Sequence, residues 1–462
     1  MGIKRQNNQL ELAFMTESRG ESPRAVMEGT EVPVAKRDTK RPAEATARLM
    51  EEVCQRENLR KALKRVKKNR GSPGVDGMTV QQLPGYLCEH WPTIKEQLLR
   101  GAYKPQPVKR VEISKPGGGV RRLGIPTVMD RFMQQAILQV LQGRWDSTFS
   151  ESSYGFRPGR SAHQAVAQAQ IYLAEGYSWV VDIDLEKFFD RVNHDMLMGR
   201  VAKRVSDKRL LKLIRALLNA GAMEDGLIVA TDEGTPQGGP LSPLLSNLML
   251  DDLDRELEKR GHRFVRYADD CNIYVRSERA GQRVMRSITC FITKKLKLKV
   301  NVSKSAIDRP WRREFLGFSF TFGREPKRRI SPQALKRFKE HIRGMTRRSG
   351  RWSIEQMVGH LTRYLLGWRG YFGFCQTPSV LRGLDSWIRR RLRNVVWKQW
   401  KRGWTRYEEL RKRSVGKRLA AQTAGSCHGP WRIARSPALS LALPNAYFIS
   451  LGLPELEHGR KA

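Results

Sequence analysis

Two short apolar stretches that carry aspartates constrain the fold of this chain more than any other feature. In the first, Trp179–Leu185, hydrophobic residues surround Asp182 and Asp184. Strand alternation places both aspartates on one face, opposite a continuous apolar face. So apolar a strand belongs inside a sheet, where the acids either form a buried ion pair or serve a functional site.

The second stretch, Phe264–Val275, has two β-prone flanks around Asp269 and Asp270, and predicts a hairpin with both aspartates at its turn. A surface turn is the alternative, because aspartate is common in turns. Adjacent carboxylates repel each other, and a divalent cation relieves the repulsion. Carboxylates suit Mg²⁺, which takes its remaining ligands from phosphates and water. Two such ions about 4 Å apart can activate a hydroxyl and stabilise a leaving phosphate.

The charge of the chain indicates an anionic partner. The 462 residues include 86 Lys and Arg against 46 Asp and Glu, a formal net charge of +40. Between Arg324 and Arg418 the sequence has 27 Lys and Arg but 6 Asp and Glu, a net charge of +21. Charge of this size predicts a partner class, and gives no reaction.

Other features exclude several classes of protein. The six cysteines are scattered without a C-x-x-C pair, which argues against a disulfide framework and a Cys-rich zinc site. The sequence contains no run of about 18 apolar residues, so no membrane span is expected. The N-terminus lacks the apolar core of a signal peptide. We therefore expect a soluble protein of a reducing cytoplasm.

Strands and helices alternate irregularly between Trp179 and Phe320, which predicts an α+β fold. Strands are expected within Val111–Pro126, and helices over Leu49–Lys68 and near Asp130–Gly143. A further helix has Ser206 as its expected N-cap and ends at Gly221. Its predicted apolar stripe is Leu210, Leu211, Ile214, Leu217 and Leu218. In the basic region, Ser353 and Gln356 form an expected capping box, and a later helix carries Leu381, Leu384, Ile388, Leu392 and Val395 on one stripe.

Several motifs in fixed order resemble those of reverse transcriptases encoded by group II introns. Tyr267–Asp270 is similar to their signature turn in its Tyr-Ala-Asp-Asp form. The other motifs, in chain order, are Asn69–Gly77 (an N-terminal template loop), Lys115–Pro126 (the fingers hairpin), Ser153–Ser161 (the segment before the first catalytic strand), Gly234–Leu244 (the nucleotide loop) and Phe315–Phe318 (the primer grip). The resemblance runs from about residue 50 to the end.

This resemblance implies a right-hand polymerase fold followed by a helical domain. Residues 1–45 would be a loosely ordered extension, and residues 46–325 the fingers and palm. Residues 326–418 would be the thumb, also called the maturase or X domain. Residues 419–462 would be a short tail that binds RNA or DNA.

The resemblance also implies the catalytic residues. The first catalytic aspartate of the family lies five residues before an aromatic and six before another aspartate, which matches Asp184 with Phe189 and Asp190. Asp182 then becomes a supporting neighbour. The expected catalytic set is Asp184, Asp269 and Asp270, and the same residues with Leu185 would bind two Mg²⁺ ions, for which Mn²⁺ is a possible substitute.

Further residues are assigned to substrates. The expected contacts to the incoming deoxynucleotide are Lys115, Arg121, Phe189 and Gln237. Phe189 would be the gate against a 2′-hydroxyl, with core packing as the alternative. Lys304 is a candidate general acid or, alternatively, a solvated lysine. The primer grip would consist of Phe315, Leu316 and Gly317.

The basic helices fit the family's thumb, and their cations would bind phosphates in a salt-dependent manner. The candidate RNA-binding residues are Arg369, Arg389, Arg390, Arg393, Lys398, Lys401 and Arg402. We expect Trp368, Trp387 and Trp400 to pack in the helical core.

Taken together, the sequence predicts an RNA-directed DNA polymerase that is also a splicing maturase for its group II intron. It would support intron mobility by target-primed reverse transcription. The expected partners are intron RNA in a lariat ribonucleoprotein, target DNA, an RNA template with a DNA primer, and deoxynucleotides, but not membranes. The chain shows no cysteine-paired endonuclease domain, so the primer would come from a nick or a replication fork. The alternative is a domesticated or defence-associated reverse transcriptase without an intron partner. A splicing cofactor with an inactive polymerase is disfavoured, because all three expected aspartates are present.

Overall fold

A computed structural model describes residues 46–114, 120–224, 227–229, 234, 238–347 and 352–457. The expected N-terminal extension, residues 1–45, lies outside the described residues. The chain forms two compact units, and the described residues of the first are those within 46–165, 181–275 and 279–307. The second contains 166–180, 276–278 and 308–457. The basic helices lie in the second unit, and the expected boundary between residues 325 and 326 remains a prediction.

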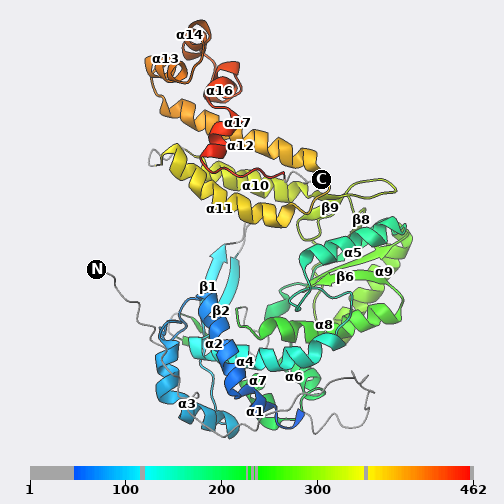
Figure 1. The fold of residues 1–462 in the computed structure, drawn as a ribbon. Helices are drawn as coiled ribbons and strands as arrows, with labels where there is room; N and C mark the ends of the chain where they lie inside the picture. Colours follow the sequence, from blue (N-terminus) through cyan, green and yellow to red (C-terminus); the bar gives the residue numbers. More distant parts are fainter. Residues whose placement is uncertain are drawn as a thin grey trace, which may run out of the picture. The chain divides into compact units, whose positions relative to one another are not determined.

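The first unit is built from helices and two four-stranded sheets (Figure 1). Its elements up to α5 are α1 (Leu49–Val53), α2 (Arg56–Asn69), α3 (Leu83–Leu99), β1 (Val108–Ser114), β2 (Val120–Ile125), α4 (Val128–Trp145), η3 (Asp146–Thr148) and α5 (Ala162–Ala174), which continues into the second unit. Its later elements are β3 (Trp179–Ile183), η4 (Phe188–Asp190), α6 (His194–Ala202), α7 (Lys208–Leu218), β4 (Ala222–Glu224), β5 (Leu227–Val229), α8 (Ser242–Lys259), β6 (Arg263–Tyr267), β7 (Asp270–Val275), α9 (Glu278–Phe291), η5 (Ile292–Leu296) and β8 (Ala306–Asp308).

One sheet has the strand order β2-β1-β4-β5. Strands β1 and β2 form the antiparallel pair expected within 111–126, and β4 joins β1 in parallel. Helix α2 packs along α4 in Figure 1. Because α2 buries Leu59, Ala62, Leu63 and Val66 at helical spacing, this contact is apolar.

The second sheet has the order β6-β7-β3-β8, so the two aspartate-bearing segments of the sequence become neighbouring strands. Strands β6 and β7 pair as the expected hairpin, and α8 packs against β6. The first sheet contains both antiparallel and parallel strand pairs, and helices lie between strands in the sequence of both sheets. This arrangement confirms the α+β fold.

Three expectations for helices were wrong in detail. The helix expected over 49–68 is interrupted at Cys54 and Gln55, which separate α1 from α2. Helix α7 is capped by Asp207 and not by Ser206, because the Asp207 carboxylate accepts hydrogen bonds from the backbone N–H groups of Arg209 and Leu210. A carboxylate at this position also suits the positive end of the helix dipole. The buried stripe of α7 contains Leu213 in place of Leu211.

The second unit is mainly helical. Its elements are β9 (Phe318–Phe320), β10 (Arg328–Ile330), α10 (Pro332–Met345), α11 (Ile354–Phe372), α12 (Pro378–Gln399), α13 (Gly403–Lys412), α14 (Lys417–Ala424), α15 (Pro430–Ile433), α16 (Pro437–Ala442) and α17 (Asn445–Ser450). The expected capping box of Ser353 and Gln356 is present at the start of α11. No helix among the described residues is long and apolar enough to cross a membrane.

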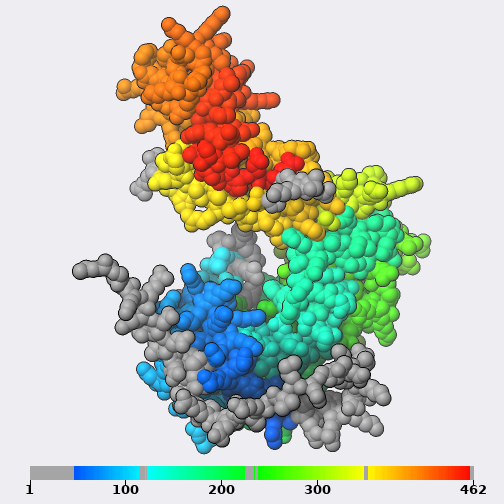
Figure 2. All heavy atoms as spheres, in the orientation of Figure 1, coloured from blue at the N-terminus to red at the C-terminus, as the bar shows by residue number. Residues whose placement is uncertain are grey.

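The residues after 418 belong to the core of this second unit. One apolar cluster includes Leu361 of α11 and Leu392 of α12 together with Leu439, Phe448 and Leu456. In Figure 2 the C-terminal part of the chain, coloured red, lies against the parts coloured orange and yellow. The expected role of residues 419–462 as a short tail that binds RNA or DNA remains a prediction, while short helices bring the scattered leucines of this segment into the core.

Candidate functional site

The β6–β7 hairpin presents the first pair of candidate carboxylates. Tyr267 pairs with Asp270 across the strands, which leaves Ala268 and Asp269 as a two-residue turn. Asp269 is therefore at the turn as expected, whereas Asp270 is the first residue of β7. Ala268 has a φ of 58°, a left-handed conformation that is unfavourable for a residue with a Cβ. Its neighbours must therefore hold the turn in place.

Asp184 follows directly after β3, and its backbone is fixed by the segment 299–305. Its N–H donates to the Ser305 hydroxyl at 3.0 Å, and its carbonyl accepts from the Asn301 N–H at 2.8 Å. The same segment carries Lys304, whose Nζ lies 3.9 Å from Asp184 Oδ2. The Asp184 side chain is 40% exposed, so it lies at the surface of the sheet end where a substrate has access.

Strands β3 and β7 are neighbours in the sheet, and each carries an acid that acts on the buried Cys271 thiol. Burial raises the pKa of the Cys271 thiol on β7, and the carboxylates of Asp270 and Asp182 both raise it further. Asp182 on β3 and Asp270 on β7 therefore act on one buried group. Asp182, Asp184, Asp269 and Asp270 are all half-buried, and the supporting role of Asp182 remains a prediction.

This donor set fits a hard divalent cation bound jointly with a substrate. In the described part of the chain, no three His, Cys, Asp or Glu side chains form a closed metal cluster. Mg²⁺ does not need one, because it usually takes one or two protein carboxylates and completes its shell with phosphate oxygens and water. Asp184 and Asp269 provide such oxygens from neighbouring elements, and Leu185 continues the chain into a bridge with Val300.

A short helical turn follows Asp184. Lys187, with a φ of 49°, turns the chain into η4. Phe188 is buried there, while Phe189 is half-buried with its ring centroid 5.2 Å from that of Phe188. The half-buried position of Phe189 is compatible with both roles considered for it, the gate and the core residue.

The nucleotide loop is anchored where the described part of it begins. The N–H of Gly234 donates to the Val192 carbonyl at 2.8 Å, and the Gly234 carbonyl lies 2.5 Å from His194 Nε2. His194 is buried at the start of α6, with its Nδ1 2.9 Å from Asn219 Oδ1. Sequence reasoning missed this histidine, since nothing in its local pattern distinguishes it from a surface residue.

Three residues expected to contact the nucleotide cannot be placed. Lys115 and Gln237 lie outside the described residues. Arg121 pairs with Ile113 through its backbone in β2, but its side chain is outside the described set. Their assignments remain predictions.

The turn at Phe315–Phe318 belongs to the second unit. Phe315 and Phe318 exchange backbone hydrogen bonds, and Leu316 and Gly317 occupy the turn with φ values of 51° and 83°. The hydroxyl of Tyr371 on α11 donates to the Leu316 carbonyl at 2.8 Å. A Cβ at Gly317 would lie 3.0 Å from the ring of Phe372, so the turn packs closely on this helix.

Comparison with known protein families accounts for both units. Residues 113–320 match the model of the reverse transcriptase family (RNA-dependent DNA polymerase), and residues 335–414 match the maturase-specific domain of group II introns. The chain belongs to the reverse transcriptases that carry a group II intron maturase domain. The predicted family is thereby confirmed, and a reverse transcriptase domain implies dependence on divalent metal ions.

Individual relatives share part of this reverse transcriptase. Protein YkfC of Escherichia coli (strain K12) is 40% identical over 219 residues, which cover 46% of this chain and 58% of that protein. The group II intron-encoded protein LtrA of Lactococcus lactis subsp. cremoris is 36% identical over 188 residues, covering 40% and 31%. The chain thus spans less than two thirds of the length of these relatives. A solved Cas6-RT-Cas1–Cas2 complex has 27% identity and a TM-score of 0.35 over 54% of this chain and 43% of that one.

The maturase-domain arginines proposed to bind RNA make contacts within the protein. Arg389 forms a 2.7 Å ion pair with Glu455, and Arg369 donates to the Glu455 carbonyl. Arg390 stacks on the Trp431 ring at 4.1 Å and donates to its carbonyl, and Arg393 donates to the Leu443 carbonyl. These four side chains therefore fasten the C-terminal segment to α11 and α12.

Of the other three cations, Lys401 and Arg402 are more accessible than these arginines. Lys401 and Arg402 are exposed between α12 and α13, and Lys398 is half-buried. The tryptophan prediction holds for Trp368 and Trp400, which are buried. Trp387 is only half-buried and lies among Lys339, Arg343 and Arg391, whose cationic groups are 5.5 to 6.0 Å from its ring centroid.

Proposed function

We propose that this reverse transcriptase is an RNA-directed DNA polymerase that also serves as the maturase of a group II intron. The observation that carries the polymerase proposal is the adjacency of β3 and β7. This adjacency places Asp184 and the Asp269–Asp270 turn on neighbouring elements of one sheet. The matched maturase domain supports the proposal that the natural partner is intron RNA.

In the proposed reaction, a DNA primer is extended on an RNA template with deoxynucleotides. Asp184, Asp269 and Asp270 would hold two Mg²⁺ ions, which Mn²⁺ could replace. Bound there, the ions would activate the primer hydroxyl and stabilise the leaving pyrophosphate.

The remaining residues of the site would orient the substrate and supply a proton. Phe189 lies on η4, beside the anchored start of the nucleotide loop, and would lie under the sugar. Lys115, Arg121 and Gln237 would contact the triphosphate and the base. Lys304 would donate a proton to the leaving group. Because Lys304 Nζ lies 3.9 Å from Asp184 Oδ2, the alternative is that this lysine acts only as a counter-ion of Asp184. The turn of Phe315, Leu316 and Gly317 would support the primer.

The proposed cellular role is intron splicing followed by mobility. The protein would bind its intron RNA, remain with the excised lariat and reverse-transcribe it at a target DNA. Lys398, Lys401 and Arg402 are the better candidates for RNA contact, because Arg369, Arg389, Arg390 and Arg393 already have internal partners.

Primer extension on an RNA template tests the polymerase proposal, with Asp269→Ala as the inactive variant. Glu278→Gln changes an exposed acidic residue at the start of α9 that is not among the proposed metal ligands, and serves as a matched acidic control. Extension that survives Asp269→Ala would contradict the metal assignment. Sequencing of the RNA that copurifies with the protein tests the maturase proposal, and an active polymerase that retains no intron RNA would instead indicate an enzyme without an intron partner.

A further inference from the structure

The turn at Ala268 and Asp269, the proposed catalytic turn, contacts an arginine that is fully buried inside the first unit. Arg266, on β6, has no exposed side-chain surface, and neither has its partner Asp254 on α8. A buried guanidinium is costly unless it is paired and fully hydrogen-bonded. In the sequence it stands out as a charge within the apolar run Phe264–Tyr267, yet no local pattern identifies its partner.

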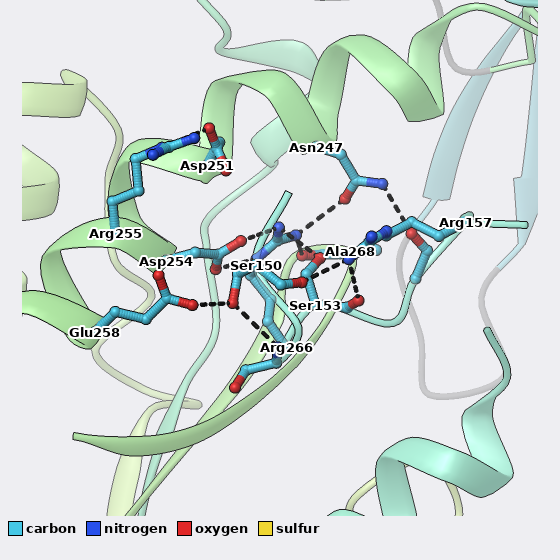
Figure 3. Close-up of polar contacts among 12 residues, drawn as sticks. Ser150, Ser153, Arg157, Asn247, Asp251, Asp254, Arg255, Glu258, Arg266 and Ala268 are labelled. Atoms are coloured by element: carbon cyan, nitrogen blue, oxygen red, sulfur yellow. Dashed lines mark hydrogen bonds and ion pairs between the residues drawn. The ribbon is translucent and has the colours of Figure 1, made fainter. Parts of the chain in front are cut away.

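All five N–H donors of Arg266 have acceptors (Figure 3). Nε and Nη2 donate to the two carboxylate oxygens of Asp254 at 2.7 and 2.5 Å. Nη2 also donates to the Ser153 hydroxyl at 2.8 Å, and Nη1 to Asn247 Oδ1 at 3.1 Å. The fifth bond, from Nη1 to the carbonyl of Ala268 at 2.8 Å, reaches the catalytic turn itself.

This last bond acts on the residue whose conformation most needs support. Ala268 has the left-handed φ of 58°, and its carbonyl belongs to the peptide that leads into Asp269. Because a peptide is planar, fixing the carbonyl also fixes the N–H of Asp269 and the direction in which its Cα leaves the turn. Arg266 therefore restrains the backbone from which the proposed metal ligand extends.

Two further elements join the same network. Asn247 accepts from Arg266 and donates through Nδ2 to the Gly155 carbonyl at 2.8 Å. The backbones of Arg266 and the preceding motif also pair, since the Tyr154 N–H donates to the Arg266 carbonyl at 2.9 Å. The turn is thus held from β6, from α8 and from the segment 153–155.

The charge of Arg266 is maintained despite its position. Burial alone would lower its pKa, but the Asp254 carboxylate outweighs burial, and the pKa of Arg266 lies above its usual value. Lysine could keep the charge at this position. It could not supply a planar set of donors to Asp254, Asn247 and Ala268 at once.

We propose that Arg266 is a positioning residue for catalysis, which sets the metal-binding geometry of Asp269 through the carbonyl of Ala268. The inference rests on the proposed polymerase function and extends it to a residue that touches neither substrate nor metal. Residues that orient metal ligands typically change metal affinity by about 10- to 100-fold when they are removed.

The principal test is the double variant Arg266→Met with Asp254→Leu. It removes both buried charges together, which preserves folding better than removing one, and it deletes the bond to Ala268. We expect the Mg²⁺ concentration for half-maximal primer extension to rise about tenfold or more, and kcat to fall by up to about 10²-fold. The KM for deoxynucleotides should change less, because their expected contacts lie elsewhere.

Arg266→Lys is the second variant, in case the double variant does not fold. It retains a buried positive charge opposite Asp254 and should show the same rise in the Mg²⁺ requirement, with a lower thermal midpoint because several acceptors of Arg266 lose their donors. Arg255→Met on α8 is the matched control. Arg255 pairs with Asp251 at 2.9 Å and does not touch the turn, so its Mg²⁺ dependence should equal that of the unmodified protein.

The outcomes separate this inference from the proposed function. If Asp269→Ala abolishes extension but a folded Arg266 variant keeps the normal Mg²⁺ midpoint and kcat, the positioning role is wrong and the polymerase proposal stands. If Asp269→Ala remains active, the metal assignment fails first. A parallel loss of activity and thermal stability with an unchanged Mg²⁺ midpoint would show that Arg266 has only a structural role.

Discussion

Substitution of Gly155 by alanine should damage the polymerase while leaving most of the protein folded. Gly155 lies in the segment before β3 and packs directly against the proposed catalytic turn at Ala268 and Asp269. A Cβ at this position would lie 2.3 Å from the backbone nitrogen of Ala268 and 3.0 Å from the carbonyl carbon of Tyr267. Both are main-chain atoms, which cannot move aside as a flexible side chain would.

The size of the effect follows from this geometry. Ordinary contact begins near 3.4 Å, so the turn and the motif must separate by roughly 1 Å, and a displacement of that size at a catalytic group can cost about 10²-fold in rate. Overpacking of this kind typically destabilises a protein by about 1–3 kcal/mol. The Ala268 carbonyl, restrained by Arg266, opposes the displacement, so strain is expected in addition to the shift.

The assay is primer extension under single-turnover conditions, combined with thermal unfolding. Gly143→Ala is the control, because Gly143 lies in α4 with no atom within 4 Å of an added Cβ. This control should be neutral or slightly stabilising, since alanine favours helix more than glycine by up to about 1 kcal/mol. A Gly155→Ala protein with normal kcat and a normal Mg²⁺ requirement would refute the argument that the turn is confined from this side.

Three further results are expected. Asp207→Ala removes the α7 cap and the acceptor of the buried Met50 N–H, and should cost about 2–4 kcal/mol by urea unfolding; an unchanged transition would contradict it. Although burial opposes its charge, Arg209 and the Met50 N–H lower the pKa of Asp207. Its contribution to the free energy of unfolding is therefore complete above the unfolded-state pKa near 4 and is lost as the pH falls further. Asp207→Asn should reduce this loss of stability at acid pH, and a pH dependence identical to that of the unmodified protein would argue against it. In filter-binding titrations across salt, Lys401→Gln should reduce the salt dependence of RNA affinity by about one ion, whereas Arg389→Gln should mainly loosen the C-terminal segment, seen as faster hydrogen exchange; equal salt slopes for the two variants would contradict this distinction.

The sequence predicted the chemistry of the site better than its support. The Asp269–Asp270 hairpin and the strand before Asp184 follow from local alternation, and their adjacency follows from the family resemblance. The residues behind them do not, because Gly155, Asp254 and Arg266 meet only after α8 and the segment 150–157 have folded onto β6. A lone arginine in an apolar strand was the available signal, since it requires a buried acid somewhere in the fold.

For the basic helices, the sequence predicted the buried faces but not the internal partners of the arginines. Periodicity predicted the buried faces of α11 and α12 well, as Leu361 and Leu392 illustrate. Charge and family position then assigned Arg369, Arg389, Arg390 and Arg393 to RNA, together with three further cations. Composition cannot show that Arg389 and Arg393 meet the returning C-terminal segment, because that contact joins residues more than 45 positions apart. Likewise, the single-residue error at the α7 cap arose because Ser206 and Asp207 are both good caps, and the choice depends on the distant partner Met50.

The anchoring of the Phe315–Phe318 turn has a mechanical consequence. The Tyr371 hydroxyl and the Phe372 ring tie this turn to α11, and both partners lie in the unit that contains the maturase domain. A change in the orientation of α11 should therefore move the Phe315–Phe318 turn together with the helix. In the proposed enzyme, RNA that binds the maturase helices and shifts α11 would then also shift the proposed primer grip. Template copying and intron binding would therefore be mechanically coupled through α11.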